Sequence, residues 1–424
     1  MSESRANAGG KPVSEEIELS GHIIDSLVLP RAFDAIMNQG GEFDVLEIRV
    51  GKKKDETSFA RLRITAPDAA TLDAILTQVQ ELGAELVSQK DVATAPAPRD
   101  GALPPDFYST TNLNTEVRLA GRWLRVENPE MDVAIVVDRA QGRAFTRPMV
   151  HVKKGDPIAV GHDGLRAIPL ERARENEIFS FMNSAVSSEK PKKLAIHDIA
   201  REMKEIKARG GKILVVAGPA IIHGGAGPYL GALIRAGYVD VLFGGNAIAT
   251  HDVESALLGT SLGVNLGSGL PVEGGHKHHM KALNVIRTAG SLRAAVEQGI
   301  LKSGVMYEAI RKDIKMVLAG SIRDDGPMPD VITDVLVAQD EMRSAVRGVE
   351  LALMICTMLH AIATGNLLPA TVKTVIVDIN PAVVTKLADR GSWQAVGLVT
   401  DAELFLRELC LALSVEPSAA ASSH

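Results

Sequence analysis

The feature of this sequence that most constrains its fold is a set of short runs in the second half that are apolar on both faces. The runs occupy residues 212–218, 239–245, 314–320 and 373–379, and a helical stretch follows each of them. A strand whose residues do not alternate between apolar and polar is buried on both sides, which requires a parallel sheet with helices on each face. We therefore expect a doubly wound α/β domain over residues 191–414.

The region before this domain combines strand and helix periods in a different order. Residues 16–90 predict the order β-α-β-β-α-β, because apolar residues recur at every second position in four segments and with a helical period in two. This order is typical of the ferredoxin-like, or split βαβ, fold. We place a ferredoxin-like α+β domain at residues 16–112, and the fold alone indicates no chemistry.

A connector rich in proline and alanine follows this unit. We expect residues 93–105 to continue neither a helix nor a sheet, since proline lacks the backbone donor that both use. Residues 113–165 hold short alternating runs divided by Gly, Asn and Pro, which predict a small β-rich module. The stretch 169–200 favours helix, and we group residues 113–190 as one β-rich subdomain with a helical connector.

Charge and composition exclude several classes of partner. With 46 basic and 52 acidic residues and a net charge of -6, the chain has no basic stripe for a phosphate backbone, so we expect no nucleic-acid partner. The N-terminus lacks the apolar core of a secretory signal, and Cys356 and Cys410 lie in apolar segments rather than in a disulfide framework. A cytoplasmic location follows. The polar ends, residues 1–15 and 415–424, are expected to be disordered.

One uncharged stretch, residues 351–369, is long enough to be taken for a membrane span. His360, Thr364 and Gly365 interrupt it, so we interpret it as a buried helix and expect no membrane partner. In such a helix Thr357, His360 and Thr364 share one face. An unsatisfied buried polar group costs about 1–3 kcal/mol. Either a bound ligand or the neighbouring backbone must therefore supply hydrogen bonds to this polar face.

Polar residues also follow two of the predicted strands at their carboxyl ends, where open α/β sheets bind ligands. Asn246, Ala247 and His251 come after one of them, and the alternative there is an asparagine cap with a histidine satisfied inside the core. Another strand ends in Asp378. An acid in this position suits the paired hydroxyls of a ribose and repels a 2′-phosphate, which favours NAD over NADP, whereas the alternative is a cap for the helix that starts at Pro381.

Three further segments are candidates for a functional role. The strand at 212–218 runs into a glycine-rich turn, Gly225-x-Gly227-x-x-x-Gly231, which is either an anion-binding turn or only a tight connection. Two loops are dense in ionisable residues, and such loops are a usual setting for function. The first contains Glu273, His276, Lys277, His278 and His279, and the second contains Arg323, Asp324 and Asp325. Histidines this close in sequence are awkward zinc ligands, so we expect no metal.

These motifs together resemble a known family over nearly the whole chain. The segments GPAIIHGGAGPYLGALI, FGGNAIATHDVE, EGGHKHHMKALN, AGSIRDDGPMPDV and MLHAIATGNLLP are similar to those of the archaeal-type ornithine cyclodeaminases. That family shares its N-terminal region with the conserved domain of lysine-oxoglutarate reductase/saccharopine dehydrogenase (LOR/SDH) proteins. It is also similar to the C-terminal part of cyanobacterial arginine dihydrolase fusions. The resemblance implies a Rossmann-like NAD domain, distantly similar to that of deoxyhypusine synthase.

The resemblance also implies an activity. An ornithine cyclodeaminase converts L-ornithine to L-proline and ammonia, with hydride leaving Cα for NAD⁺, the δ-amine attacking the imine, ammonia leaving, and the hydride returning to the ring imine. No net oxidation results, so NAD is expected to stay bound. By matching positions, the resemblance assigns the nucleotide to Asn246, Ala247, Asp325, Thr357, Met358, Leu359, His360, Asp378, Asp401 and Ala402.

The catalytic groups are assigned from the chemistry of the reaction rather than from matching positions. A base must take a proton from the α-ammonium before hydride leaves, and Lys277, crowded by histidines, or His276 could do so. Arg323 could bind the substrate carboxylate with both arms of its guanidinium. Two other functions stay open. One is another NAD-dependent enzyme of amino acids or polyamines, such as a saccharopine-type dehydrogenase or a deoxyhypusine-synthase-like transferase, and the other is an NAD-binding regulator without turnover. We expect a homo-oligomer in each case.

Overall fold

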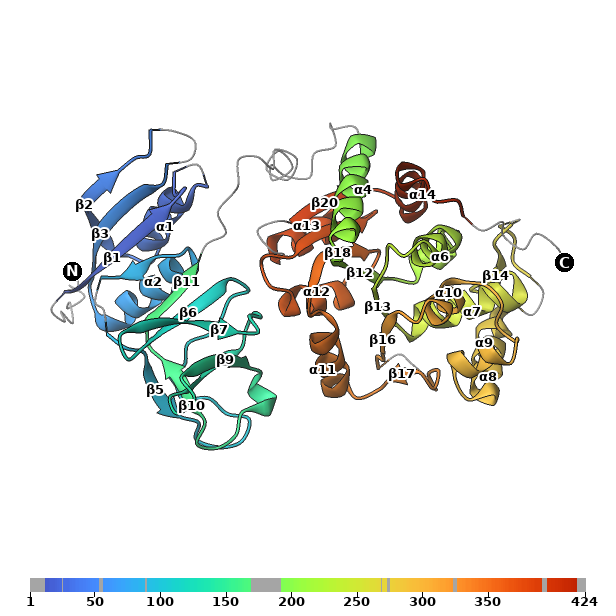
Figure 1. The fold of residues 1–424 in the computed structure, drawn as a ribbon, viewed down its shortest axis with the longest axis horizontal. Coiled ribbons are helices and arrows are strands. Elements are labelled where there is room, and N and C mark those ends of the chain that lie inside the picture. The colour runs from blue at the N-terminus through green and yellow to red at the C-terminus, as the bar shows by residue number, and fades with distance from the viewer. Residues whose placement is uncertain are drawn as a thin grey trace, which may run out of the picture. The chain divides into compact units, whose positions relative to one another are not determined.

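The structure is a computed structural model that describes residues 12–24, 26–52, 56–87, 90–168, 192–267, 269–272, 275–322, 326–390 and 395–417. The chain divides into two compact units, Met1–Ser180 and Phe181–His424. The first unit contains two sheets whose strands pair antiparallel except for one parallel pair, and the second contains a large parallel sheet (Figure 1). Arg323 and Asp325, as well as the predicted helix over residues 169–191, lie outside the described residues.

The first unit begins with the predicted β-α-β-β-α-β order. Its elements are β1 (Val13–Gly21), α1 (Val28–Asn38), β2 (Glu42–Arg49), β3 (Ser58–Ala66), α2 (Ala69–Glu81) and β4 (Glu85–Leu86). The strands lie in the order β2-β3-β1-β4 and pair antiparallel, which confirms the ferredoxin-like fold. Ala60, Leu62 and Ile64 alternate along β3 on the buried face. The pattern of period two that predicted the strand therefore corresponds to one buried face.

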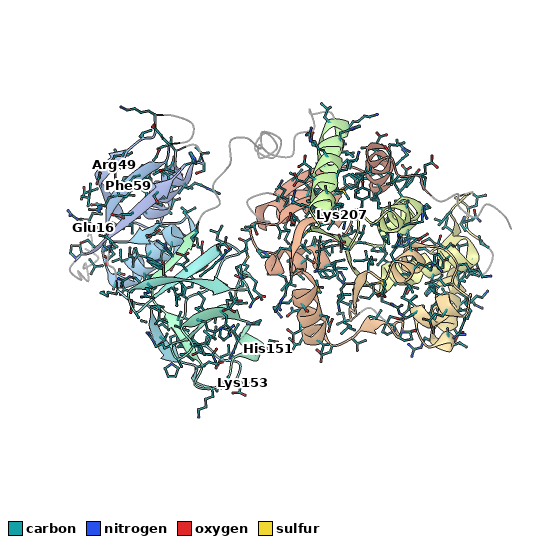
Figure 2. The ribbon with its side chains drawn as sticks, in the orientation of Figure 1. Glu16, Arg49, Phe59, His151, Lys153 and Lys207 are labelled. Carbon is teal, nitrogen blue, oxygen red and sulfur yellow. The ribbon has the colours of Figure 1, made fainter. Side chains whose placement is uncertain are left out.

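The other face of this sheet is polar and is stabilised by cross-strand pairs. Arg63 on β3 pairs with Glu16 on β1 at 2.8 Å. The guanidinium of Arg49 stacks over the Phe59 ring at 4.6 Å (Figure 2). Such exposed pairs contribute little to stability individually. They identify this face as a solvated surface rather than a second core.

A seven-stranded sheet follows in the same unit and is the predicted β-rich module. It comprises β5 (Ala93–Pro96), β6 (Asn114–Leu119), β7 (Arg122–Glu127), β8 (Ala134–Asp138), β9 (Arg143–Arg147), β10 (Pro157–Val160) and β11 (Leu165–Ile168), with a short 3-10 helix, η1 (Met149–His151). The strand order is β11-β6-β7-β9-β8-β10-β5. Its side chains form two apolar clusters, one around Ile135 and Val137 and the other around Val136 and Ile158.

One expectation for this region is wrong. The proline-rich connector was expected to join no sheet, but its start forms strand β5, which pairs antiparallel with β10. The reason is the position of β5 at the edge of the sheet, where one side of the strand needs no hydrogen-bonding partner. A proline such as Pro96 is tolerated on an edge strand, because its missing donor can face away from the neighbouring strand.

The second unit is the expected doubly wound domain. Its strands are β12 (Lys212–Ala217), β13 (Val241–Gly245), β16 (Lys315–Ala319), β17 (Val331–Ile332), β18 (Val349–Ile355), β19 (Lys373–Asp378) and β20 (Ala395–Val399). They pair in parallel in the order β17-β16-β13-β12-β18-β19-β20. Apart from the short edge strand β17, this is the 3-2-1-4-5-6 order of dinucleotide-binding Rossmann folds.

Helices cover both faces of the parallel sheet. The helices are α4 (Lys192–Ala208), α5 (Ala220–His223), α6 (Gly227–Arg235), α7 (Asn246–Leu258), α8 (His278–Ala289), α9 (Leu292–Glu297), α10 (Val305–Arg311), α11 (Val335–Ala345), α12 (Leu359–Leu367), α13 (Pro381–Arg390) and α14 (Ala402–Leu413). Leu214 and Met354 face a core shared with α11, α12 and α13, whereas α4 packs on the opposite face of β12 and β18. A two-stranded hairpin, β14 (Thr260–Ser261) and β15 (Val264–Asn265), and a 3-10 helix, η2 (Gly275–Lys277), lie between α7 and α8.

The expectation of one buried helix over residues 351–369 is wrong for the first part of that stretch. Its first part is β18, a central strand of the sheet, and helix α12 begins only at Leu359. A short, wholly apolar run fits a buried strand as well as a buried helix, so periodicity could not separate them. Thr357 consequently lies in the turn after β18 and does not share a helical face with His360 and Thr364. No helix of the described residues is both long and apolar enough to cross a membrane.

Candidate functional site

The carboxyl edge of the parallel sheet contains the point at which the chain reverses its direction of winding. From β12 the chain continues to β13 on one side, and from β18 it continues to β19 on the other. Because the connections leave the neighbouring strands β12 and β18 in opposite directions, this is the point at which open α/β sheets form a ligand-binding crevice at the carboxyl ends of the strands. Predicted cofactor residues from four connections gather at this edge, namely Asn246, Thr357, Asp378 and Asp401.

The turn from β18 to α12 is tightly constrained. Cys356 adopts a left-handed conformation with φ of 52°, and its amide donates to the Val377 carbonyl at 2.8 Å. Gly218, at the end of β12, lies so close that a Cβ there would be 1.8 Å from the Cys356 carbonyl oxygen. Burial, together with the nearby charges of Asp378 and Asp401, raises the pKa of the Cys356 thiol to about 12. The thiol is therefore a packing group and not a nucleophile.

Helix α12 presents its N-terminus to the same crevice. Met358 precedes the helix, and no side chain of the described residues caps it. The amides of an uncapped first turn are suited to an anion such as a phosphate. The apolar side chains of Met358 and Leu359 are exposed beside these amides, Leu359 by 75%.

The two polar residues of α12 have different surroundings. Gly245, at the end of β13, has no side chain, and a Cβ there would lie 3.1 Å from Cε1 of His360. His360 thus packs over the end of β13, across the crevice from its own strand. Thr364 is fully buried and donates to the His360 carbonyl at 2.7 Å. For Thr364 the backbone alternative is confirmed, and no ligand is needed to satisfy it.

Asp378 and Asp401 hold different positions at the ends of their strands. Asp378 accepts a hydrogen bond from the Asn380 amide at 2.8 Å, and it is Asn380 that caps helix α13, by accepting from Ala382 N at 3.0 Å. The capping alternative for Asp378 is therefore wrong. Asp401 does cap its helix, because it accepts from the amides of Glu403 and Leu404 at the start of α14. Asp378 is the freer of the two carboxylates to meet a ligand.

On the other side of the crevice, Asn246 opens helix α7. Its side-chain oxygen accepts from the Met328 amide at 3.1 Å and from the Thr250 hydroxyl at 3.3 Å. The residue that precedes the helix is Gly245, so Asn246 is not an N-cap as the alternative held. Asn246 instead ties the start of α7 to the segment before β17.

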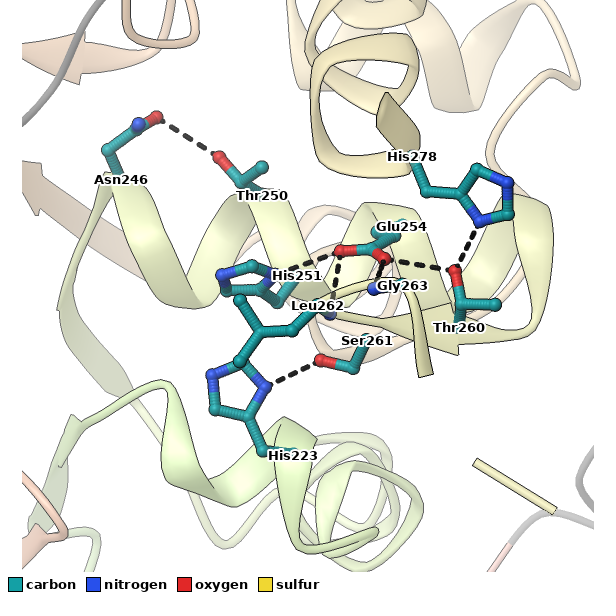
Figure 3. Close-up of polar contacts among 10 residues, drawn as sticks. All are labelled: His223, Asn246, Thr250, His251, Glu254, Thr260, Ser261, Leu262, Gly263 and His278. Atoms are coloured by element: carbon teal, nitrogen blue, oxygen red, sulfur yellow. Dashed lines mark hydrogen bonds and ion pairs between the residues drawn. The ribbon is translucent and has the colours of Figure 1, made fainter. Parts of the chain in front are cut away.

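A buried polar network runs along α7 and continues into the hairpin and α8 (Figure 3). Glu254 is fully buried, and its carboxylate accepts from His251 Nδ1 at 2.9 Å, Thr260 Oγ1 at 2.9 Å and the Gly263 amide at 2.9 Å. Burial alone would raise the pKa of Glu254, but the hydrogen bonds from His251, Gly263 and Thr260 outweigh it and lower the pKa. Glu254 is thus an ionised carboxylate held inside the protein.

Two more histidines adjoin this network. His223, at the end of α5, bonds Ser261 Oγ through Nδ1 at 2.6 Å, and its ring meets that of His251 edge-on at 4.6 Å between centroids. Burial, followed by repulsion from His251, lowers the pKa of His223. On α8, His278 bonds Thr260 Oγ1 through Nδ1 at 2.8 Å. The network therefore joins α5, α7, the β14–β15 hairpin and α8.

Asp252, the other carboxylate in the middle of α7, has a structural role. It is buried and accepts from the amides of Val305 and Met306 at 2.8 and 2.7 Å, at the start of α10. Burial raises the pKa of Asp252 to about 6 against these hydrogen bonds.

The structure describes only some of the predicted catalytic residues. Lys277 ends the 3-10 helix before α8 and is exposed, while its neighbour His278 is buried in the network around Glu254. The side chain of His276 and the whole of Arg323 and Asp325 lie outside the described residues. Among the residues that are described, no three His, Cys, Asp or Glu side chains form a possible metal site.

Sequence reasoning missed His223, Glu254, Thr260 and Ser261. For Glu254 a signal existed, since it follows His251 by three residues and such pairs lie on one face of a helix. The hydroxyls of Thr260 and Ser261 gave no local signal, because their partners come from other elements.

Comparison with known proteins identifies the family. Family models match residues 14–113 (LOR/SDH bifunctional enzyme conserved region), 114–196 (arginine dihydrolase ArgZ-like, C-terminal, first region) and 197–409 (arginine dihydrolase ArgZ-like, C-terminal, Rossmann fold). The ornithine cyclodeaminase of Methanocaldococcus jannaschii is 56% identical over 397 residues, which cover 92% of this chain and 94% of the relative. The chain belongs to the ornithine cyclodeaminase family. The resemblance inferred from its motifs is thereby confirmed, as is the Rossmann-like domain.

Two solved structures, of ArgZ and AgrE, are also similar to this chain. The apo structure of ArgZ, an arginine dihydrolase from cyanobacteria, matches with a TM-score of 0.85 and 39% identity over 97% of this chain. The ternary complex of AgrE with ornithine and NAD⁺ matches with a TM-score of 0.51 and 42% identity, also over 97% of this chain. The chain spans only 60% and 59% of these two longer proteins.

Proposed function

We propose that this chain is an ornithine cyclodeaminase that converts L-ornithine to L-proline and ammonia with a resident NAD. The observation that carries the proposal is the reversal of strand order between β12 and β18, in a chain whose relative AgrE forms a complex with ornithine and NAD⁺. Bound NAD⁺ supplies a hydride acceptor that returns the hydride to the ring imine, so that no net oxidation occurs.

The residues at the crevice fit a dinucleotide. Strand β18, helix α12 and strand β19 form a βαβ unit, and Asp378 ends its second strand about 20 residues after the turn at Thr357, the position at which a carboxylate binds ribose hydroxyls in Rossmann folds. The uncapped amides of α12 suit the pyrophosphate. Ile379, which follows Asp378, is 70% exposed and offers an apolar surface to a base.

The remaining proposed cofactor contacts lie along the same edge. Asn246 and Ala247 start α7, His360 packs over Gly245, and Asp401 and Ala402 start α14. These elements face the crevice from both sides of the reversal point, which is what a ligand with two nucleotide halves requires. We propose that Met358, Leu359 and Asp325 complete the cofactor site.

For the substrate, the proposal places charged groups beyond the nicotinamide end. Arg323 is the proposed partner of the carboxylate, and Lys277 and His276 are the proposed groups near the amines. Of these, Lys277 adjoins His278 and therefore the polar network of α7.

The experiment that tests the proposal is incubation of the purified protein with L-ornithine and NAD⁺, followed by assays of proline, ammonia and NADH. The expected result is equal amounts of proline and ammonia without NADH accumulation. NADH released in proportion to substrate would instead indicate a saccharopine-type dehydrogenase. Tight NAD binding with neither product would indicate a regulator.

We further propose that the protein acts in the cytoplasm as a homo-oligomer. Both cysteines are free thiols, Cys410 buried and Cys356 partly buried, which suits a reducing compartment in which disulfides do not form. For self-association, β2 is a sheet edge whose side chains Val45 and Ile48 are about half exposed. Antiparallel pairing of two copies of β2 that sets Val45 against Ile48 also sets Asp44 of each copy against Arg49 of the other. Light scattering of wild-type protein and of Ile48→Lys tests this arrangement, which predicts a smaller oligomer for the variant.

A further inference from the structure

The polar network along α7 contains a histidine in the arrangement that proteins use for a general base, and none of the catalytic assignments above uses it. On the basis of the proposed function, we propose that His251, held by Glu254, accepts the proton that leaves the α-ammonium of the substrate and returns it to this nitrogen when it departs as ammonia. Glu254 is then a positioning residue, which acts through His251.

The contact with Glu254 determines the tautomer of His251. An ionised carboxylate only accepts hydrogen bonds, so the 2.9 Å contact with Glu254 fixes the ring proton on Nδ1. In the neutral ring the lone pair must then be on Nε2. A carboxylate behind Nδ1 also stabilises the imidazolium that forms when Nε2 takes a proton.

Glu254 is itself held in place by several donors. Besides His251, its two oxygens accept from Thr260 Oγ1 and from the amides of Leu262 and Gly263. Because the Thr260 hydroxyl donates to Glu254, it can only accept from His278 Nδ1. The carboxylate that orients His251 is thus itself held by the hairpin and by α8, which leaves the histidine little freedom to turn.

The His251 ring also adjoins a second histidine. His223 meets it edge-on from α5, and Figure 3 shows the second ring nitrogens of both histidines on the same side, away from Glu254 and Ser261. Burial and repulsion from His251 lower the pKa of His223, so His223 stays neutral and does not oppose a charge on its neighbour. Among the residues that the structure describes, the charged and titratable groups that face His251 are Glu254 on α7 and His223 on α5, with His278 on α8 joined through Thr260.

The proton transfers balance as follows. The N–H bond of the α-ammonium breaks, its electron pair stays on nitrogen, and a new N–H bond forms at His251 Nε2. The freed pair allows the Cα–H bond to break toward NAD⁺, the oxidant of the proposed function. After the δ-amine has added to the imine carbon, the His251 imidazolium gives its proton back to the α-nitrogen, which leaves as ammonia; the δ-nitrogen exchanges its own protons with water.

The test compares the pH dependence of kcat for proline formation in the wild type, His251→Asn, Glu254→Gln and Lys277→Ala. We expect His251→Asn to lose about 100-fold or more in kcat, together with the acid limb of the profile. Glu254→Gln should keep this limb but shift it to lower pH, because the neutral amide no longer favours the imidazolium. Lys277→Ala should keep the limb where it is. The exposed His197 on α4 provides the control, and His197→Asn should match the wild type.

The outcomes separate this inference from the proposed function. A wild type that forms no proline overturns the proposed function, whereas an active wild type with an equally active His251→Asn overturns the role of His251 alone. NAD binding and urea unfolding of each variant report whether it is folded, since Glu254 also holds the hairpin. If neither network variant folds, the wild-type profile decides, because a rate that does not fall at acid pH contradicts a base of this kind.

Discussion

A single methyl group at Gly218 should open the cofactor crevice. A Cβ at this position would lie 1.8 Å from the Cys356 carbonyl oxygen and 2.5 Å from its carbon, whereas ordinary contacts begin at 3.4 Å. Both neighbours are backbone atoms, so no side chain can rotate away. In Gly218→Ala the ends of β12 and β18 must therefore separate by about 1.6 Å, the gap between the two distances.

This separation should lower both the stability of the protein and its affinity for NAD. Overpacking of a well-packed site costs about 1–3 kcal/mol, which urea unfolding should show as a lower free energy of unfolding. The displaced atoms belong to the turn that precedes α12, whose amides are proposed to bind the pyrophosphate. A misplacement of about 1 Å can cost 100-fold in function, so we expect NAD to bind 10- to 100-fold more weakly, as measured by calorimetric titration.

Gly365 supplies a matched control from the helix that follows the same turn. A Cβ there meets no atom within 4 Å, and the residue lies inside α12. Gly365→Ala should leave NAD binding unchanged and stabilise the fold by about 0.5–1 kcal/mol, since glycine is the poorer helix former. Equal stability and NAD affinity in Gly218→Ala and the wild type would refute the reasoning, as would equal losses in both variants.

Three further predictions concern individual groups. Asp378→Asn should weaken NAD binding by about 10- to 100-fold, the value of one hydrogen bond to a charged group, and should raise the relative affinity for NADP; calorimetry with both nucleotides checks this, and an unchanged ratio contradicts it. Because the pKa of Asp252 rises from 3.8 to about 6 on folding, its contribution to stability is fully present below pH 3.8 and is lost as the pH rises through 6. The loss is about 3 kcal/mol, which Asp252→Asn should abolish in urea unfolding measured between pH 4 and pH 7. Both cysteine thiols, with pKa values of about 12, should react slowly with a thiol reagent at pH 8 in the native protein and rapidly in urea; fast native labelling would show that the burial is wrong.

The sequence was sufficient for most of the architecture, because the relevant signals are local. The strands of the first unit alternate between buried and exposed residues, and four strands of the second unit carry the apolar runs of a parallel sheet. Strand β18 was missed because it lies in an apolar stretch whose residues, Leu351 to Met354, include no β-branched side chain. Leucine, alanine and methionine are good helix formers, so the local propensity of these residues favours a helix. Only the pairing of β18 with β12 and β19 decides its structure, and pairing is a long-range property.

The site was predictable where it depends on strand ends and not where it depends on tertiary contacts. Asn246 and Asp378 follow recognisable strands, and all parallel strands place their carboxyl ends at one edge. Glu254 shows the opposite case. A glutamate on a helix is expected to be exposed. It is buried here because the hairpin 260–265 supplies a hydroxyl and two amides, and nothing near Glu254 in the sequence indicates that those donors will fold back onto it.

The sequence contains two candidate dinucleotide-binding segments, the glycine-rich turn after β12 and the strand β19 that ends in Asp378. The topology favours the second. The glycine-rich turn follows β12, but the four-residue helix α5 interrupts it, and α6 starts only at Gly227, ten residues after the strand ends. Its Gly225 adopts φ of 75°, which accounts for a glycine there as a requirement of the turn. The β18–α12–β19 unit has no such glycines, yet it combines a direct strand-to-helix turn, uncapped helix amides and an acid at the end of the second strand. Since a dinucleotide needs a helix N-terminus beside the strand end and an acid for the ribose, we propose that the adenosine half binds at β18–β19 and the nicotinamide half toward β12–β13, next to His251.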